Sequence, residues 1–199
     1  MQEIFNLEMV PPGLRSRIPP GKHRANFVLL VDIGTHEIRF RDYHSDFKRQ
    51  ILVGFELPDY LRYGADVPHI IQAVYNYSTD TRSKLINVFK DVLYTFHPGN
   101  WNLQRLLGIS LDVITTNNDK GYPRLEALQL SRDRDGKFPR YPSYVKPFCW
   151  HFERDGEPEI PAWVPNLYGA PLIAKIHSSR EYQRLIREQQ REEEEGNNG

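Results

Sequence analysis

The stretch HIIQAVYNYSTDTRSKLINVFKDVLYTF, residues 69–96, decides the fold, because its hydrophobic period changes from that of a strand to that of a helix. Residues 69–77 are rich in β-branched and aromatic side chains, which favours a β-strand. The apolar side chains that follow recur at i, i+4, i+7, i+8 and i+11, one stripe of an amphipathic helix; they are Leu85, Phe89, Val92, Leu93 and Phe96. Residues 78–80 offer N-caps, and His-Pro-Gly at 97–99 ends the helix.

Two strands are predicted on each side of this segment. Before it, residues 25–33 (ANFVLLVDI) form a dense apolar run and residues 50–57 (QILVGFEL) a second one. After it, residues 109–115 (ISLDVIT) and 122–130 (YPRLEALQL) flank a turn-rich connection and pair as a hairpin. Three strands, a helix and two strands follow one another as in an OB barrel, whose helix lies between strands three and four. We therefore expect a mainly β (α+β) fold, a five-stranded OB barrel with extended arms.

The flanking segments are predicted to be arms rather than further domains. Residues 1–24 contain two Pro-Pro-Gly sequences and are expected to form an extended arm before a barrel at residues 25–130. Residues 131–178 are proline-rich and are expected to pack on the barrel as a second extended arm. Residues 179–199 are predicted to hold a short helix, around 179–190, and a disordered acidic tail.

Composition limits the classes of function. The 199 residues carry no formal net charge, which argues against coating of nucleic acid through bulk charge alone. Residues 120–146 are nevertheless basic and residues 191–199 acidic, which fits either a basic binding surface with an acidic tail or ordinary solvated charge. No segment has the length of apolar chain that spans a bilayer, and the N-terminus lacks the features of a signal peptide. We therefore expect a cytoplasmic protein.

The chemistry-bearing residues do not form a catalytic pattern. Carboxylates at Asp32, Asp42, Glu56 and Asp59 suggest a metal-dependent nuclease, but the required spacing and a nearby lysine are missing. The seven histidines are scattered, and Cys149, the single cysteine, is interpreted as a small hydrophobic residue. No phosphate-cradling glycine loop occurs. The sequence therefore predicts a non-enzymatic protein without metal or cofactor.

Six segments of the chain together resemble a family of phage-encoded, OB-fold, single-stranded-DNA-binding-like proteins. The matching sequences, in order, are IPPGKHRA with VDIGTH (residues 18–25 and 31–36), VGFELPD (53–59), YNYSTDTRSKL (75–85), LLG leading to Val113 (106–108), PAW (161–163) and SREY (179–182). The chain departs from the family at Tyr77, where the family is usually aliphatic, and in a long loop in the 130s. The resemblance implies an OB fold, single-stranded DNA binding, and a setting in phage DNA replication and recombination in the host cytoplasm.

The candidate interface follows from the way OB barrels bind ligands, on strands two and three and between two flanking loops. Here these loops are residues 36–49 and 116–121. Cations there can neutralise phosphates, while rings stack on unpaired bases for about 1–3 kcal/mol each. The predicted binding residues are Arg39, Arg41, Tyr43, Lys48, Arg49, Tyr75, Tyr77, Lys120, Tyr122 and Arg124. An aromatic ring on a strand, such as that of Tyr75, is as readily a core residue.

Two classes of function stay open at this point. The first is a single-strand-binding accessory of phage replication or recombination, which would bind DNA without changing it. The second is a protein-interaction or structural module that docks on a partner protein through its barrel and arms. The acidic tail would either recruit replication or recombination proteins, as in bacterial single-strand-binding proteins, or act only as a solubilising or phosphate-mimicking segment. Exchange of the arms between subunits would give a homo-oligomer.

Overall fold

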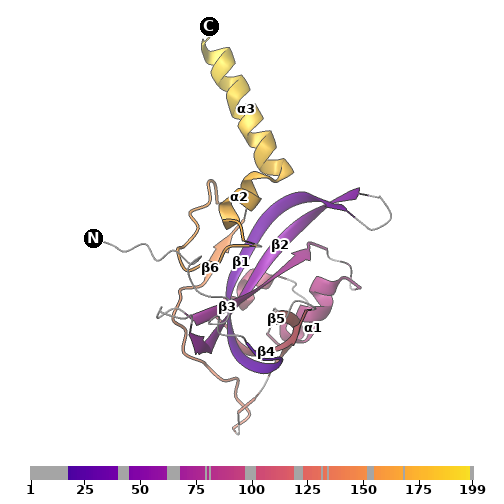
Figure 1. Ribbon diagram of the computed structural model, residues 1–199, viewed down its shortest axis with the longest axis vertical. Helices are drawn as coiled ribbons and strands as arrows, with labels where there is room; N and C mark the ends of the chain where they lie inside the picture. Colours follow the sequence, from indigo (N-terminus) through magenta and orange to yellow (C-terminus); the bar gives the residue numbers. More distant parts are fainter. Residues whose placement is uncertain are drawn as a thin grey trace, which may run out of the picture.

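A computed structural model describes residues 18–39, 45–61, 68–78, 80, 82–96, 102–118, 123–130, 132–133, 135–151, 155–167 and 169–197. The first half contains strands β1 (Gly21–Arg39), β2 (Ser45–Leu61) and β3 (Pro68–Asn76), followed by helix α1 (Lys84–Phe96). The second half contains a 3₁₀ turn at Leu103–Leu106, strands β4 (Ser110–Asn117), β5 (Pro123–Gln129) and β6 (Phe148–Trp150), and helices α2 (Leu172–His177) and α3 (Arg180–Asn197). Figure 1 shows these elements in their places.

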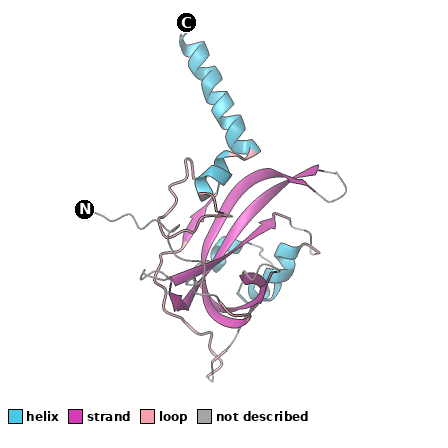
Figure 2. Ribbon diagram, viewed as in Figure 1, coloured by secondary structure: helices cyan, strands magenta, loops and turns pink. Residues whose placement is uncertain are grey.

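Strand β1 organises the sheet, because every other part of the sheet is joined through it (Figure 2). The strand order is β3-β2-β1-β4-β5, and all four ladders are antiparallel. One edge of β1 pairs with β2 from Asn26 to Arg39. The other edge pairs with β4 at residues 21–26 and, in parallel, with β6 at residues 29–31. A single long strand thus pairs with the strand that follows it and with two strands from distant parts of the chain.

The prediction of a mainly β (α+β) fold with a helix after the third strand is confirmed, whereas the prediction of a closed five-stranded barrel is wrong. Strands β3 and β5 approach each other, but no hydrogen-bonded ladder joins them within the described residues, so the sheet is open. Helix α1 contacts both of these edge strands and so occupies the place where the sheet would close. A sixth strand, β6, was not predicted, because three residues are too few to show a period.

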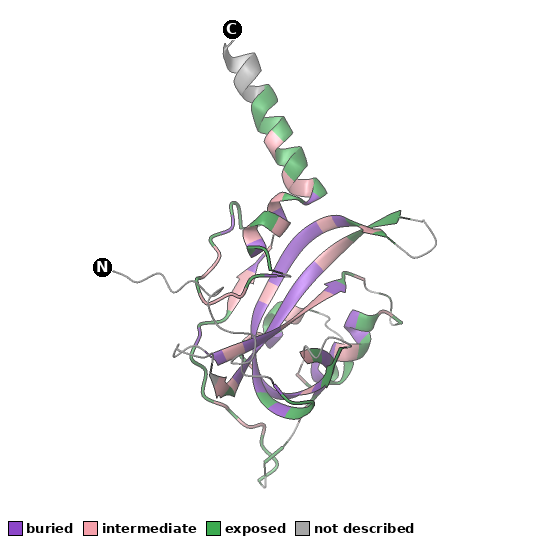
Figure 3. Cartoon of the chain, viewed as in Figure 1, coloured by how far each residue is buried: buried purple, intermediate pink, exposed green. Residues whose placement is uncertain are grey.

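The inner face of the sheet holds an aromatic core. The rings of Phe27 on β1, Phe55 on β2 and Phe89 on α1 pack with centroids 5.2 to 6.1 Å apart. Figure 3 shows the buried residues concentrated along β1 and β2. The core accounts for the apolar stripe of α1, because Leu85, Phe89, Val92 and Leu93 all face it.

The outer face of β1 and β2 is covered by the C-terminal third of the chain. Leu29, Val31 and Ile33 pack there against Trp150, Leu167, Leu172 and Ile176. Successive residues of a strand point to opposite faces, so a strand buried on both faces is apolar at every position. This explains why residues 25–33 form a continuous apolar run instead of an alternating one.

Glu56 fastens residues 142–145 to the outer face. Its carboxylate is fully buried, and accepts hydrogen bonds from Asn26 Nδ2 (3.1 Å), Ser143 Oγ (2.6 Å) and the Tyr144 backbone N–H (2.7 Å). Asn26 also donates to the Pro142 carbonyl at 2.8 Å. The carboxylate that could have suggested a nuclease therefore holds the arm in place.

Helix α3 begins where β1 leaves the core. Ser179 Oγ accepts from the Tyr182 N–H at 3.2 Å, an N-terminal cap, and Glu181 accepts from the Thr35 N–H (2.7 Å) and Thr35 Oγ1 (2.5 Å). Gly34, with φ +79°, allows this approach: a Cβ on it would overlap Ser179 Cβ and lie 2.7 Å from Ser179 Oγ. The short helix predicted around residues 179–190 in fact runs to Asn197, so the acidic residues expected to be disordered are its last turns. Glutamate is a good helix former, which favours this continuation. Within the described residues, no helix is long and apolar enough to cross a membrane.

His36 on β1 makes the stability of the fold sensitive to pH. The side chain is buried and donates through Nε2 to the Ile33 carbonyl at 2.7 Å; burial lowers the pKa of its imidazole. As the pH falls through the ordinary histidine pKa of about 6.5, the unfolded chain takes up this proton before the folded chain does. We therefore expect stability to fall as the pH falls below that value. Urea unfolding at about pH 7.5 and about pH 5.5 should show a smaller loss for His36→Gln than for the wild type; equal losses would contradict it.

Candidate functional site

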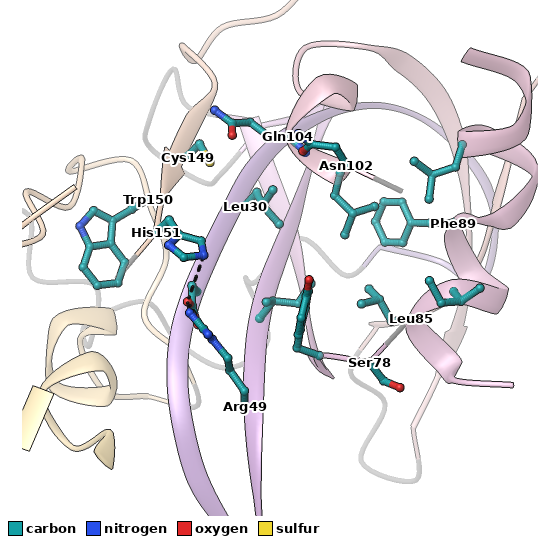
Figure 4. Close-up of a pocket in the computed structure, with 16 residues that line it drawn as sticks. Leu30, Arg49, Ser78, Leu85, Phe89, Asn102, Gln104, Cys149, Trp150 and His151 are labelled. Atoms are coloured by element: carbon teal, nitrogen blue, oxygen red, sulfur yellow. Dashed lines mark hydrogen bonds and ion pairs between the residues drawn. The ribbon is translucent and has the colours of Figure 1, made fainter. Parts of the chain in front are cut away.

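A groove of about 650 Å³ lies between the inner face of β1–β2 and helix α1 (Figure 4). Its walls come from five parts of the chain: β1, β2, the end of β3, helix α1 with the 3₁₀ turn, and residues 149–151 at the end of β6. Strand alternation decides which side chains reach it. Leu30 and Asp32 of β1 face the groove, whereas Leu29, Val31 and Ile33 face the C-terminal third.

The floor of the groove is apolar. Leu30 and Ile51 line it from the sheet, and Leu85, Phe89 and Leu93 line it from α1. In Figure 4 the Phe89 ring points toward the sheet across the middle of the groove. Most of this lining is itself buried, and Phe89 is fully so, which means that an aromatic or heterocyclic ring in the groove would contact mainly the half-buried Leu30 and Leu103.

One end of the groove is polar and rigid. The Asp32 carboxylate is 5% exposed, and accepts from Arg49 through Nε (3.1 Å) and Nη2 (2.5 Å) and from the Gly34 N–H (3.0 Å). His151 Nε2 lies 3.8 Å from the same carboxylate, the contact drawn in Figure 4. Both of these Arg49 N–H groups converge on Asp32 Oδ2, which holds the guanidinium at the rim. Since Asp32 balances the charge of Arg49, this end favours a polar, largely uncharged group over a phosphate.

Tyr77 provides an exposed ring beside this polar end. It follows the last residue of β3, and its backbone N–H donates to the Arg49 carbonyl at 2.7 Å. Its side chain is 56% exposed and lines the groove. A large aromatic ring in this position can stack on a planar ligand without moving the backbone.

The ten predicted binding residues do not form one cluster. Arg49 and Tyr77 both line the groove. Arg39 and Lys48 lie farther out on the β1–β2 hairpin and pair with Glu37 (3.6 Å) and Asp46 (2.6 Å). Arg124 lies on β5, opposite Thr116 of β4, and does not line the groove. Arg41, Tyr43, Lys120 and Tyr122 lie outside the described residues.

Tyr75 belongs to the core and not to the groove. Its ring is 5% exposed and packs in the inner apolar cluster, and burial raises the pKa of its hydroxyl to about 12. Tyr75 and Tyr77 share a strand face, as the sequence predicts, but β3 ends between them, so only Tyr77 emerges from the core. We therefore remove Tyr75 from the candidate interface.

Sequence reasoning missed most of the groove lining. The floor residues of α1 belong to a helical apolar stripe, which signals burial but not that Leu85, Phe89 and Leu93 also line a groove. His151 follows Phe148, Cys149 and Trp150, a short apolar segment that was assigned to an arm. Its parallel pairing with residues 29–31 brings it to Asp32, and no local pattern signals such a distant pairing.

Comparison with family models, with curated proteins and with solved structures finds no match to this chain. The resemblance noted for residues 18–182 therefore stays a prediction. In the described residues, His, Cys, Asp and Glu side chains form no group of three or more that could hold a metal ion. The groove itself is therefore the feature from which a function can be inferred.

Proposed function

We propose that this protein binds single-stranded DNA in the groove and does not alter it chemically. The observation that carries the proposal is the open groove with an apolar floor, in which the exposed ring of Tyr77 stands beside the Asp32–Arg49 pair. Stacking of unpaired bases on exposed aromatic rings is, with neutralisation of phosphates by cations, one of the two sequence-independent contacts in single-strand binding. Bases in a duplex are already stacked and paired, so a groove of this kind favours a single strand.

The topology supports the same proposal. The order β3-β2-β1-β4-β5, with α1 between β3 and β4, is the strand order of an OB barrel in which the contact between β3 and β5 has not closed. We therefore propose an opened OB-type barrel, a fold that commonly binds oligonucleotides. Because fold alone does not establish function, the groove carries more weight than the topology.

A role in phage DNA replication or recombination in the host cytoplasm comes from the family resemblance. Independence from metals and cofactors comes instead from the sequence, which lacks metal-ligand and cofactor-binding motifs. A protein-interaction module is the second candidate, favoured by helix α3, an 18-residue helix that extends away from the sheet (Figure 1). Such a module would bind a partner protein and no oligonucleotide.

Replacing Tyr77 by alanine is expected to weaken oligonucleotide binding by about 5- to 150-fold, the equivalent of about 1–3 kcal/mol for one stacked base. Fluorescence anisotropy of a labelled oligothymidylate, titrated with protein at about 50 and about 200 mM salt, measures this change. Tyr94→Ala is the matched control, because Tyr94 is an exposed tyrosine (68%) on α1 that does not line the groove.

Three outcomes would contradict the proposal. Equal affinities of the Tyr77→Ala and Tyr94→Ala variants would remove the groove as the binding site. Equal affinity for a duplex of the same length would remove strand selectivity. No anisotropy change with the wild-type protein at either salt concentration would leave the protein-interaction module as the better proposal.

A further inference from the structure

Helix α3 carries a stripe of four arginines that the groove does not use. Arg180, Arg184, Arg187 and Arg191 stand at i, i+4, i+7 and i+11, so they lie along one face of the helix. Together with Thr35 of β1 they line a second, shallow groove of about 560 Å³. From the rise of an α-helix, the stripe is about 16 Å long.

The second groove is lined by more arginines than carboxylates. Among the side chains that the structure describes, Glu181 and Glu188 line it beside the four arginines, while the four glutamates at residues 192–195 follow the stripe in the sequence and make α3 as a whole acidic. Glu181 accepts hydrogen bonds from Thr35, and Glu188 lies 3.6 Å from Arg184, whose side chain is 71% exposed. Arg180 is placed over the Phe47 ring, 3.8 Å from its centroid. The groove lined by residues 180–191, and not the acidic end of the helix, therefore fits a polyanion.

The arginine stripe and the first groove adjoin each other at one pair of residues in the β1–β2 ladder. Thr35 and Arg49 are paired residues of β1 and β2, and Thr35 binds Glu181 while Arg49 lines the first groove. The pKa of the Glu181 carboxyl reflects this proximity. Burial would raise it, but the hydrogen bonds from Thr35 and the nearby Arg49 guanidinium hold it below its ordinary value. A strand leaving the first groove past Arg49 would thus arrive at the first turn of α3.

We propose that the arginine stripe binds the phosphates of the same DNA single strand whose bases occupy the groove. This inference rests on the proposed function and adds a second contact to it. The groove binds the bases of the strand, and α3 binds its sugar-phosphate backbone. Arginine binds phosphate oxygens through paired N–H groups, and the stripe spans about five phosphates of a stacked strand.

The salt dependence of oligonucleotide binding tests whether the arginine stripe contacts phosphates. Each phosphate contact to a single strand contributes about −0.7 to the slope of log affinity against log salt concentration. The Arg184→Gln/Arg187→Gln double variant should therefore bind oligothymidylate with a slope about 1.4 less steep than the wild type. Arg184→Lys/Arg187→Lys should retain the slope, because the charges remain.

The double variant Arg105→Gln/Arg140→Gln is the charge-matched control. It removes two exposed arginines that lie on the 3₁₀ turn and on the proline-rich arm. Far-ultraviolet circular dichroism checks that α3 stays helical.

The possible outcomes distinguish failure of the arginine-stripe proposal from failure of the groove proposal. A wild-type slope in the Arg184→Gln/Arg187→Gln variant, with binding still weakened by Tyr77→Ala, would overturn the role of the arginine stripe and leave the groove proposal standing. An equal loss of slope in the control variant would also overturn it, since the effect would then be one of overall charge. Tighter binding of a polyglutamate peptide than of the oligonucleotide would assign α3 to an acidic protein partner. No DNA binding by the wild type would overturn both proposals.

Discussion

Replacing Glu56 by alanine is expected to lower the free energy of unfolding by about 4 kcal/mol, because three hydrogen bonds to its buried carboxylate are lost. The donors are Asn26 Nδ2, Ser143 Oγ and the Tyr144 N–H, all within 3.1 Å of the carboxylate. Ser143 and Tyr144 belong to the proline-rich arm, so the loss of these bonds loosens the arm from the sheet. The loss should therefore appear in two measurements, as a lower urea midpoint and as faster proteolysis within residues 139–147.

Glu126→Ala provides the control for Glu56→Ala. Glu126 also lies on a strand, β5, but its side chain is exposed, so its removal should change stability by no more than about 0.5 kcal/mol. Equal stabilities of the two variants would show that Glu56 does not fasten the arm.

Replacing Gly34 by alanine is expected to cost about 3 kcal/mol of stability, from two separate sources. The left-handed backbone conformation at φ +79° costs about 1–2 kcal/mol for a residue with a Cβ, and forcing that Cβ against Ser179 adds about 1–3 kcal/mol. The steric part can be relieved only by moving Ser179, and with it the N-terminal cap of α3. Thermal unfolding measures the total cost.

Gly136→Ala isolates the conformational part of this cost. Gly136 has a similar φ of +75°, but a Cβ there would meet nothing within 4 Å. We expect this variant to lose only about 1–2 kcal/mol. Equal losses in the two variants would mean that α3 does not depend on the close approach of Ser179 to Gly34.

The sequence contained enough information for the central strands and for α1. Residues 25–33 are apolar at every position because both faces of β1 are covered, and the stripe from Leu85 to Phe96 matches the buried face of a helix. The outer parts of β1 and β2 were missed for the opposite reason. They form a two-stranded ribbon beyond the core, and residues 45–48 are largely exposed, so no apolar period marks them as strand.

The candidate site was less predictable than the fold. Arg49 and Tyr77 were identified because a cation and an amphipathic ring are recognisable from composition alone. Tyr75 shares the strand face of Tyr77, and only the end of β3 separates a core ring from an exposed one. Asp32 and His151 meet through the parallel pairing of β1 and β6, which depends on the packing of the whole arm. The arginine stripe was present in the sequence as a helical spacing, but its relation to Thr35 required the fold.

The position of β1 has a consequence for the way the chain folds. Its partners lie far away in the sequence: Ala25 pairs with Leu111 and Leu30 with Cys149. Such long-range pairing places the protein among slow-folding topologies, since a large loop must close before each contact forms. During synthesis at about 5–20 residues per second, β1 waits for several seconds before its β4 partner exists. Through that interval the most apolar strand of the protein has one edge without its native partner, so newly made chains depend on protection of this edge against aggregation.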